Sequence, residues 1–134
     1  MTTFVDTSAL YALIHEDDAA HTKALAWLEG ISSAGPERLR THNYVVVETI
    51  ALTHARLGSP AVRMLIDDVL PACEVRYVDD ELHQHAVIAY LAGLSRGGVS
   101  FVDRMSFAMM RAERIDRAFA FDPDFRREGF ATVP

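Results

Sequence analysis

The segment NYVVVETIALTHARLG, residues 43–58, sets the organisation of the chain. Its β-branched residues favour a strand, but the segment is too long for one strand, and Gly58 provides a helix end. The segment before it, ERLRTH at 37–42, is short enough to be a strand. We therefore predict a strand that leads directly into a helix, which is the repeating unit of a parallel sheet.

The same alternation continues on both sides of this segment. We predict strands at 2–6, 37–42, 73–79, 117–122 and 131–133. We predict helices at 7–15, 21–31, 43–58, 59–70, 80–96 and 100–115. Thr7 or Ser8 is the expected N-cap of the first helix, and Ser59 that of the fourth. The expected fold class is α/β, with a small parallel β-sheet flanked by helices in three layers.

Composition limits the possible classes of protein. A chain of 134 residues fits one domain, expected to span 1–134, and its 50% apolar content is that of a globular protein. A single cysteine, the lack of an N-terminal signal segment and the lack of a membrane-length apolar run favour the cytoplasm. The net charge of −6 argues against a basic surface for nucleic acid, unless cations lie between protein and phosphate.

Two carboxylates occupy unexpected positions on apolar helix faces. Glu48 shares its face with Tyr44, Ala51, Leu52 and Ala55. Asp103 shares its face with Val99, Phe107 and Met110, and Arg104 is the cation that could turn toward it. A lone buried carboxylate is costly unless it is paired or binds a metal ion. The alternative is that each lies at the edge of the buried stripe and reaches water.

Two further acids end predicted strands. Asp6 follows the first strand and Asp122 ends the strand RAFAFD, so both would point into one crevice if the strands are neighbours. The alternative for each is an ordinary turn or helix-capping aspartate. Four converging acids would repel one another, and a divalent cation removes that repulsion. Oxygen ligands select Mg²⁺ or Mn²⁺ over zinc or copper.

Four motifs resemble those of PIN domains, most closely of VapC-type toxins. They are FVDTSALYAL, NYVVVETIAL, VSFVDRMSFAMMR and RAFAFDPDFRREGF, beginning at residues 4, 43, 99 and 117. The resemblance implies a metal-dependent endoribonuclease that is the toxin of a type II toxin–antitoxin module. It also implies that the catalytic and metal-binding acids are Asp6, Glu48, Asp103 and Asp122. Ser8, Asp124 and Asn43 match supporting positions.

Within this resemblance, Asp6 and Asp103 are the expected direct ligands of Mg²⁺ or Mn²⁺. Glu48 and Asp122 complete the site or orient the attacking water. The positions after the third motif hold Met105, Ser106 and Phe107 instead of a further acid, so one metal ion and two both stay open. Two other functions also stay open: an RNA-processing nuclease outside such a module, and an inactive binding module, which the intact set of acids disfavours.

The expected partners are an RNA substrate, a cognate antitoxin whose tail covers the groove, and a second copy of the chain. Helices 43–57 and 59–70 could supply the dimer surface, with core packing as the alternative. Positive charge concentrates near the last two motifs, where it would steer RNA, meet an acidic partner or be solvated. The residues concerned are Arg111, Arg114, Arg117, Arg126 and Arg127.

Overall fold

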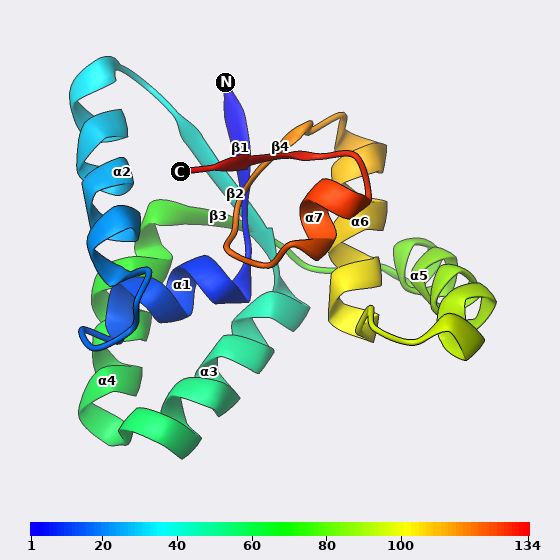
Figure 1. Ribbon diagram of the computed structural model, residues 1–134, viewed down its shortest axis with the longest axis horizontal. Coiled ribbons are helices and arrows are strands. Elements are labelled where there is room, and N and C mark those ends of the chain that lie inside the picture. Colours follow the sequence, from blue (N-terminus) through cyan, green and yellow to red (C-terminus); the bar gives the residue numbers. More distant parts are fainter.

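The computed structural model describes residues 1–134 as five parallel strands and the helices between them (Figure 1). The strands are β1 (Thr2–Val5), β2 (Arg38–His42), β3 (Cys73–Arg76), β4 (Arg117–Phe119) and β5 (Ala131–Val133). They form one sheet in the order β3-β2-β1-β4-β5. The predicted α/β class with a small parallel sheet is confirmed.

The α-helices are α1 (Thr7–Ile14), α2 (His21–Ala34), α3 (Asn43–Leu57), α4 (Ser59–Met64), α5 (Asp80–Gly93), α6 (Phe101–Glu113) and α7 (Asp124–Arg127). A π-helical turn at Leu65–Val69 and short 3₁₀ turns at Leu70–Ala72 and Leu94–Arg96 complete the chain. None of these helices combines the length and the apolar character that crossing a bilayer requires.

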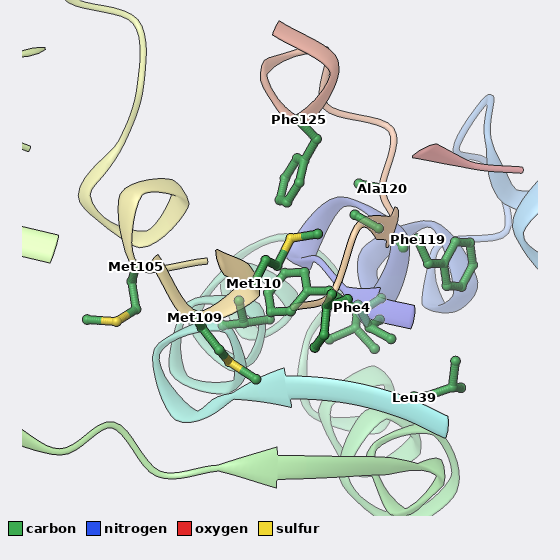
Figure 2. Packing of buried hydrophobic residues seen from close by; sticks show 14 of the residues in the cluster. Phe4, Leu39, Met105, Met109, Met110, Phe119, Ala120 and Phe125 are labelled. Atoms are coloured by element: carbon green, nitrogen blue, oxygen red, sulfur yellow. The ribbon is translucent and has the colours of Figure 1, made fainter. Parts of the chain in front are cut away.

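Helices cover the sheet on both faces, and the alternation of side chains along β1 shows how. Phe4 points to the side of α6 and α7, where its ring lies 6.0 Å from that of Phe125, and Met109 and Met110 lie around it (Figure 2). The next residue, Val5, lies on the opposite face, toward α1 and α2. On that face Trp27 of α2 packs its ring 4.4 Å from that of Phe119.

Several predicted boundaries are wrong. The predicted helix 59–70 stays α-helical only to Met64, because Pro71 has no N–H to continue the ladder and disfavours helical geometry before it. The strands predicted at 73–79 and 117–122 end at Arg76 and Phe119. The helix α7 was not predicted, since four residues carry no periodic pattern.

The predicted caps of two helices are also wrong. Asp6, not Thr7 or Ser8, is the N-cap of α1, and Gly58 occupies that position in α4 without a side-chain hydrogen bond. The helical segment that begins with α5 ends after the 3₁₀ turn at Gly97 and Gly98, whose φ angles of 67° and 87° glycine adopts without strain.

Candidate active site

Asp6 lies at the carboxyl end of β1, next to β4. These two strands pair in parallel, with Val5 opposite Phe119, and the Asp6 N–H donates to the carbonyl of Phe119 at 3.1 Å. The Asp6 side chain is 3% exposed. Its Oδ2 accepts hydrogen bonds from the backbone N–H of Ser8 at 3.1 Å and from its hydroxyl at 2.6 Å. The predicted proximity of the first and fourth motifs therefore has a direct backbone basis.

Ser8 also contacts the segment that leads to Asp122. The N–H of Phe121 donates to Ser8 Oγ at 2.9 Å. One hydroxyl thus connects the carboxylate of Asp6 with the chain one residue before Asp122. In the structure Ser8 is a positioning residue for both acids.

Asp103 enters the same region from the first turn of α6. Ser100 caps this helix and accepts the Asp103 N–H at 3.1 Å, which fixes the backbone of Asp103. Asp103 is 9% exposed, and its carboxylate lies near those of Asp122 and Asp124, with one oxygen from each of the three within 4.8 Å of the others. The neighbouring Arg104 turns away and pairs with Glu128 at 2.9 Å.

In the loop after β4, Asp122 and Asp124 have different contacts and therefore different roles. Asp122 Oδ1 accepts the N–H of Asp124 at 2.9 Å, so the two residues form a tight turn. Asp124 itself pairs with Arg127 at 2.8 Å and is therefore partly neutralised. No ion pair involves Asp122, whose negative charge faces the other acids.

Glu48 reaches the same crevice from α3. Its helix is held to the start of α1 by the hydrogen bond from Thr49 Oγ1 to Thr7 Oγ1 at 3.2 Å. Tyr44, one turn earlier on the same face, stacks on Phe101 of α6 with centroids 6.2 Å apart. Glu48 is half-buried and forms no ion pair, and its charge acts on both Asp6 and Asp103. Glu48 therefore lies at the edge of the buried face of its helix, close to the other acids.

The crevice is electrostatically strained without a counter-cation. Burial raises the pKa of Asp6 to about 6, opposed by the Ser8 hydrogen bonds and reinforced by the charges of Asp122 and Glu48. Burial raises the pKa of Asp103 to about 7, reinforced by the charges of Asp6, Asp122 and Glu48. Each of these acids lacks a Lys or Arg partner within ion-pair distance. A divalent cation with oxygen ligands fits this set, because it supplies the missing charge.

His42 is a site residue that the sequence analysis missed. It is fully buried at the end of β2, where its Nδ1 accepts the Val45 N–H at 3.2 Å and caps α3. Nε2 therefore carries the proton and donates to Ser106 Oγ at 2.9 Å, and Ser106 donates to the carbonyl of Val102 at 3.0 Å. This chain ties the helix of Glu48 to the helix of Asp103. Burial lowers the pKa of His42 to about 3.

Asn43, which was predicted to support the site, and two other polar residues, His83 and Cys73, have contacts outside the set of acids. Asn43 Oδ1 accepts the N–H of Val78 at 2.8 Å, so it fixes the connection between β3 and α5 and makes no hydrogen bond with the acids. His83 Nδ1 lies 2.6 Å from the Tyr44 hydroxyl. Cys73 is half-buried, and burial raises the pKa of its thiol to about 11, which agrees with a structural role.

The arginines near the last two motifs divide into paired and unpaired groups. Arg111 pairs with Glu128, Arg117 with Glu37 and Arg127 with Asp124. Arg114 ends α6, at the edge of the sheet where β4 begins and opposite to the acids. Arg126 forms no ion pair and lies beside Asp122.

Comparison with known proteins identifies the family of this chain. The PIN domain family model matches residues 3–131. The 23S rRNA-specific endonuclease VapC20 of Mycobacterium tuberculosis is 35% identical over 131 residues, which cover 97% of this chain and 96% of that protein. The crystal structure of VapC20, described as a sarcin–ricin-loop-cleaving toxin, superposes with a TM-score of 0.83 at 33% identity, over 98% of this chain and 97% of VapC20.

More distant structures share the fold. VapBC2 of Rickettsia felis bound to a promoter DNA fragment has a TM-score of 0.74 at 11% identity, covering 98% of this chain and 97% of that one. FitAcB of Neisseria gonorrhoeae has a TM-score of 0.72 at 13% identity, covering 100% of this chain and 97% of that one. The family model spans nearly the whole sequence. The chain belongs to the PIN domain family.

Proposed function

We propose that this chain is a divalent-metal-dependent endoribonuclease and the toxin of a type II toxin–antitoxin module, with residues 1–134 as one nuclease domain. The observation that carries the proposal is the convergence of four carboxylates without a cationic partner, two of them with pKa values raised to about 6 and about 7. Such a cluster is unfavourable for stability and is typical of a catalytic centre.

Asp6 and Asp103 are the proposed direct ligands, because they are the most buried and the most perturbed of the acids. Asp122 completes the set, and Asp124 supports it through the turn that the two residues share. All donors are carboxylate oxygens, which suits Mg²⁺ or Mn²⁺. When bound, such an ion supplies charge neutralisation at the phosphoryl oxygens and a nucleophile at neutral pH.

Glu48 is the proposed residue that orients the attacking water. Its carboxylate forms no ion pair and, unlike those of Asp6 and Asp122, accepts no hydrogen bond from the backbone, so it is free to accept a proton from a water molecule in the crevice. Ser8 holds the Asp6 carboxylate in one orientation. The hydrogen bond between His42 and Ser106 keeps α3 and α6, and with them Glu48 and Asp103, at a fixed separation.

RNA is the proposed substrate, and 23S ribosomal RNA is the first RNA to examine, because VapC20 is similar over nearly the whole chain. The cytoplasm, which contains ribosomes, is the proposed location. An antitoxin protein is the proposed inhibitor, since the structurally similar chains include toxin–antitoxin complexes.

A homodimer is also proposed, formed by the surface of α3, α4 and the following turn. Val47 is 65% exposed there, and Met64 and Ile66 are 46% and 44% exposed. Ile66 also lines a depression of ≈ 290 Å³ between these segments, with His54 on its α3 side. Exposed apolar side chains on adjacent helices are a typical component of a dimer interface.

The proposed function is tested by inducing the protein in bacteria and mapping new RNA 5′ ends during growth arrest. The unmodified protein is expected to arrest growth and to create ends at discrete RNA positions. Asp103→Asn, expressed at the same level, is expected to do neither. Normal growth with abundant folded protein and unchanged RNA ends would contradict the proposal. A small neighbouring gene whose product relieves the arrest would separate a toxin from a processing nuclease.

A further inference from the structure

A second polar depression adjoins the acid crevice and shares Asp122 with it. Its volume is ≈ 270 Å³, and its lining includes Lys23, Phe121, Asp122, Arg126 and Thr132. Lys23 comes from the first turn of α2, Arg126 from α7 and Thr132 from β5. The depression thus lies at the carboxyl edge of the sheet, where parallel α/β proteins bind ligands. Its size is close to the roughly 300 Å³ lower limit of small-ligand pockets.

The two cations in this depression are unpaired, in contrast to most cations of the chain. Seven of the 13 Lys and Arg side chains form ion pairs with carboxylates. The cations without such a pair are Lys23, Arg56, Arg63, Arg96, Arg114 and Arg126. Lys23 and Arg126 line the same depression, next to the proposed catalytic acid Asp122.

Arg126 is oriented without being neutralised. Its Nε donates to Thr132 Oγ1 at 2.6 Å, so a neutral hydroxyl fixes the guanidinium plane. The two terminal nitrogens make no hydrogen bond within the chain and keep their full positive charge. A guanidinium held in this way is prepared for two parallel hydrogen bonds to a phosphate.

Lys23 occupies a position that helix electrostatics disfavour. It lies in the first turn of α2, where no acidic residue is present and where the positive end of the helix dipole repels a cation. Local stability therefore does not explain a lysine here. An anion bound in the depression would interact favourably with both Lys23 and Arg126.

We propose that Lys23 and Arg126 bind a backbone phosphate of the RNA strand next to the phosphate that is cleaved. This inference rests on the proposed endoribonuclease function. Asp122 lines both the depression and the crevice, so a ligand that reaches the acids and continues past Asp122 passes these two cations. A polynucleotide provides a regular series of phosphates for such a path. The chain can thus hold RNA locally despite its net charge of −6.

The test measures RNA affinity as a function of KCl concentration at fixed Mn²⁺ concentration. A labelled single-stranded RNA is bound to protein carrying Glu48→Gln, which is expected to retain the fold and to prevent cleavage. Lys23→Gln and Arg126→Gln are each expected to weaken binding about tenfold, the equivalent of one charge-assisted hydrogen bond. Each is also expected to reduce the slope of log affinity against log salt by about 0.7. Arg114→Gln, at the opposite edge of the sheet, is the matched control and is expected to keep both values.

Thr132→Val separates orientation from charge. It preserves the β-branched shape and the cation but removes the hydroxyl that holds Arg126, so affinity should fall while the salt slope is retained. Salt slopes in Lys23→Gln and Arg126→Gln equal to that of the Arg114→Gln control would overturn the inference. Unchanged slopes combined with weaker antitoxin binding would also overturn it, because the depression would then be a protein contact.

Cleavage by the otherwise unmodified protein separates this inference from the function on which it rests. If the protein cuts RNA and the two variants cut with an unchanged KM, only the phosphate subsite is wrong. If the protein neither binds nor cuts RNA, the proposed function fails, and the subsite fails with it. The expected result is a raised KM with a nearly unchanged kcat for both variants.

Discussion

Ser8 Oγ lies 2.6 Å from Asp6 Oδ2 and accepts the N–H of Phe121 on its other side. This hydroxyl holds the acid at the end of β1 and the chain that leads to Asp122 in one arrangement. It also lowers the pKa of Asp6, against the effect of burial. The geometry of the crevice and its proposed affinity for a cation therefore both depend on one side chain outside the set of acids.

Ser8→Ala should weaken metal binding and activity by about 10- to 100-fold, as is typical for residues that orient metal ligands. Loss of the hydrogen bond raises the pKa of Asp6 further, so protons compete more strongly with the cation. The pH at which activity is half-maximal should move upward. Ser8→Thr, which retains the hydroxyl, is the control. An alanine variant with unchanged metal affinity and pH profile would show that Ser8 is only a structural residue.

Asp103→Asn should stabilise the metal-free protein, and the gain should depend on pH. The pKa of Asp103 is about 7 in the folded protein against 3.8 as its ordinary value. Below both values the carboxyl is protonated in both states and carries no penalty. As pH rises toward 7, the unfolded chain loses the proton first, so the folded parent loses stability at about 1.4 kcal/mol per pH unit.

The variant lacks this penalty, so its advantage should grow between about pH 4 and pH 7. Denaturation in urea with EDTA, at several pH values, measures it. With saturating Mn²⁺ the advantage of the variant should shrink, since a ligand at a hundredfold excess over Kd stabilises the parent by about 2.7 kcal/mol and the variant lacks one of the proposed metal ligands. If the metal-free variant is less stable than the metal-free parent at every pH and is still stabilised by Mn²⁺, Asp103 has a structural role only.

His42→Phe should destabilise the protein most above pH 6.5. The parent imidazole stays neutral in the folded state, because burial lowers its pKa from 6.5 to about 3. Below pH 6.5 the unfolded chain takes up a proton that the folded chain refuses, so the parent loses about 1.4 kcal/mol per pH unit. The phenylalanine variant has no such loss, and its deficit should shrink as pH falls to 5. A deficit of His42→Phe that stays constant with pH would contradict a buried imidazole that is neutral in the folded protein.

Val47→Asp should convert the proposed homodimer to a monomer at micromolar concentration. Val47 is 65% exposed on α3, so the substitution does not disturb the core. Ile88→Asp is a matched control, because Ile88 is 66% exposed on α5, outside the proposed interface. Light scattering should give a dimer for the parent and the control. A parent that is monomeric, or a Val47→Asp variant that remains dimeric, would exclude this interface.

Much of the fold follows from local sequence signals. The segment at 43–58 forms a helix in spite of its β-branched residues, because its length and Gly58 outweigh their preference for strands. Glu48 and Asp103 were identifiable because a carboxylate is unusual on an apolar helix face. The two acids after β1 and β4 could be placed together only on the condition that these strands are neighbours, and the structure shows that they pair in parallel.

The remaining features depend on tertiary contacts that no local pattern records. His42 bonds to Ser106, 64 positions away, and Asn43 bonds to Val78, 35 positions away. Asp6 is as good an N-cap as serine, but the predicted strand extended through it, so the start of the helix was placed one or two residues too late. Arg126 differs from its paired neighbour Arg127 only in the partner that the folded chain brings to it.

Asp6, Glu48, Asp103 and Asp122 are proposed to form a metal-dependent ribonuclease centre. Cleavage of purified 23S ribosomal RNA by the purified protein tests this proposal most directly. In Mg²⁺ or Mn²⁺ the protein should produce discrete internal cuts, which should disappear in EDTA and return when the metal is restored. Asp6→Asn and Asp103→Asn, shown to be folded by circular dichroism, should leave the RNA intact. Cleavage that persists in EDTA, or in both variants, would contradict this assignment of the catalytic centre.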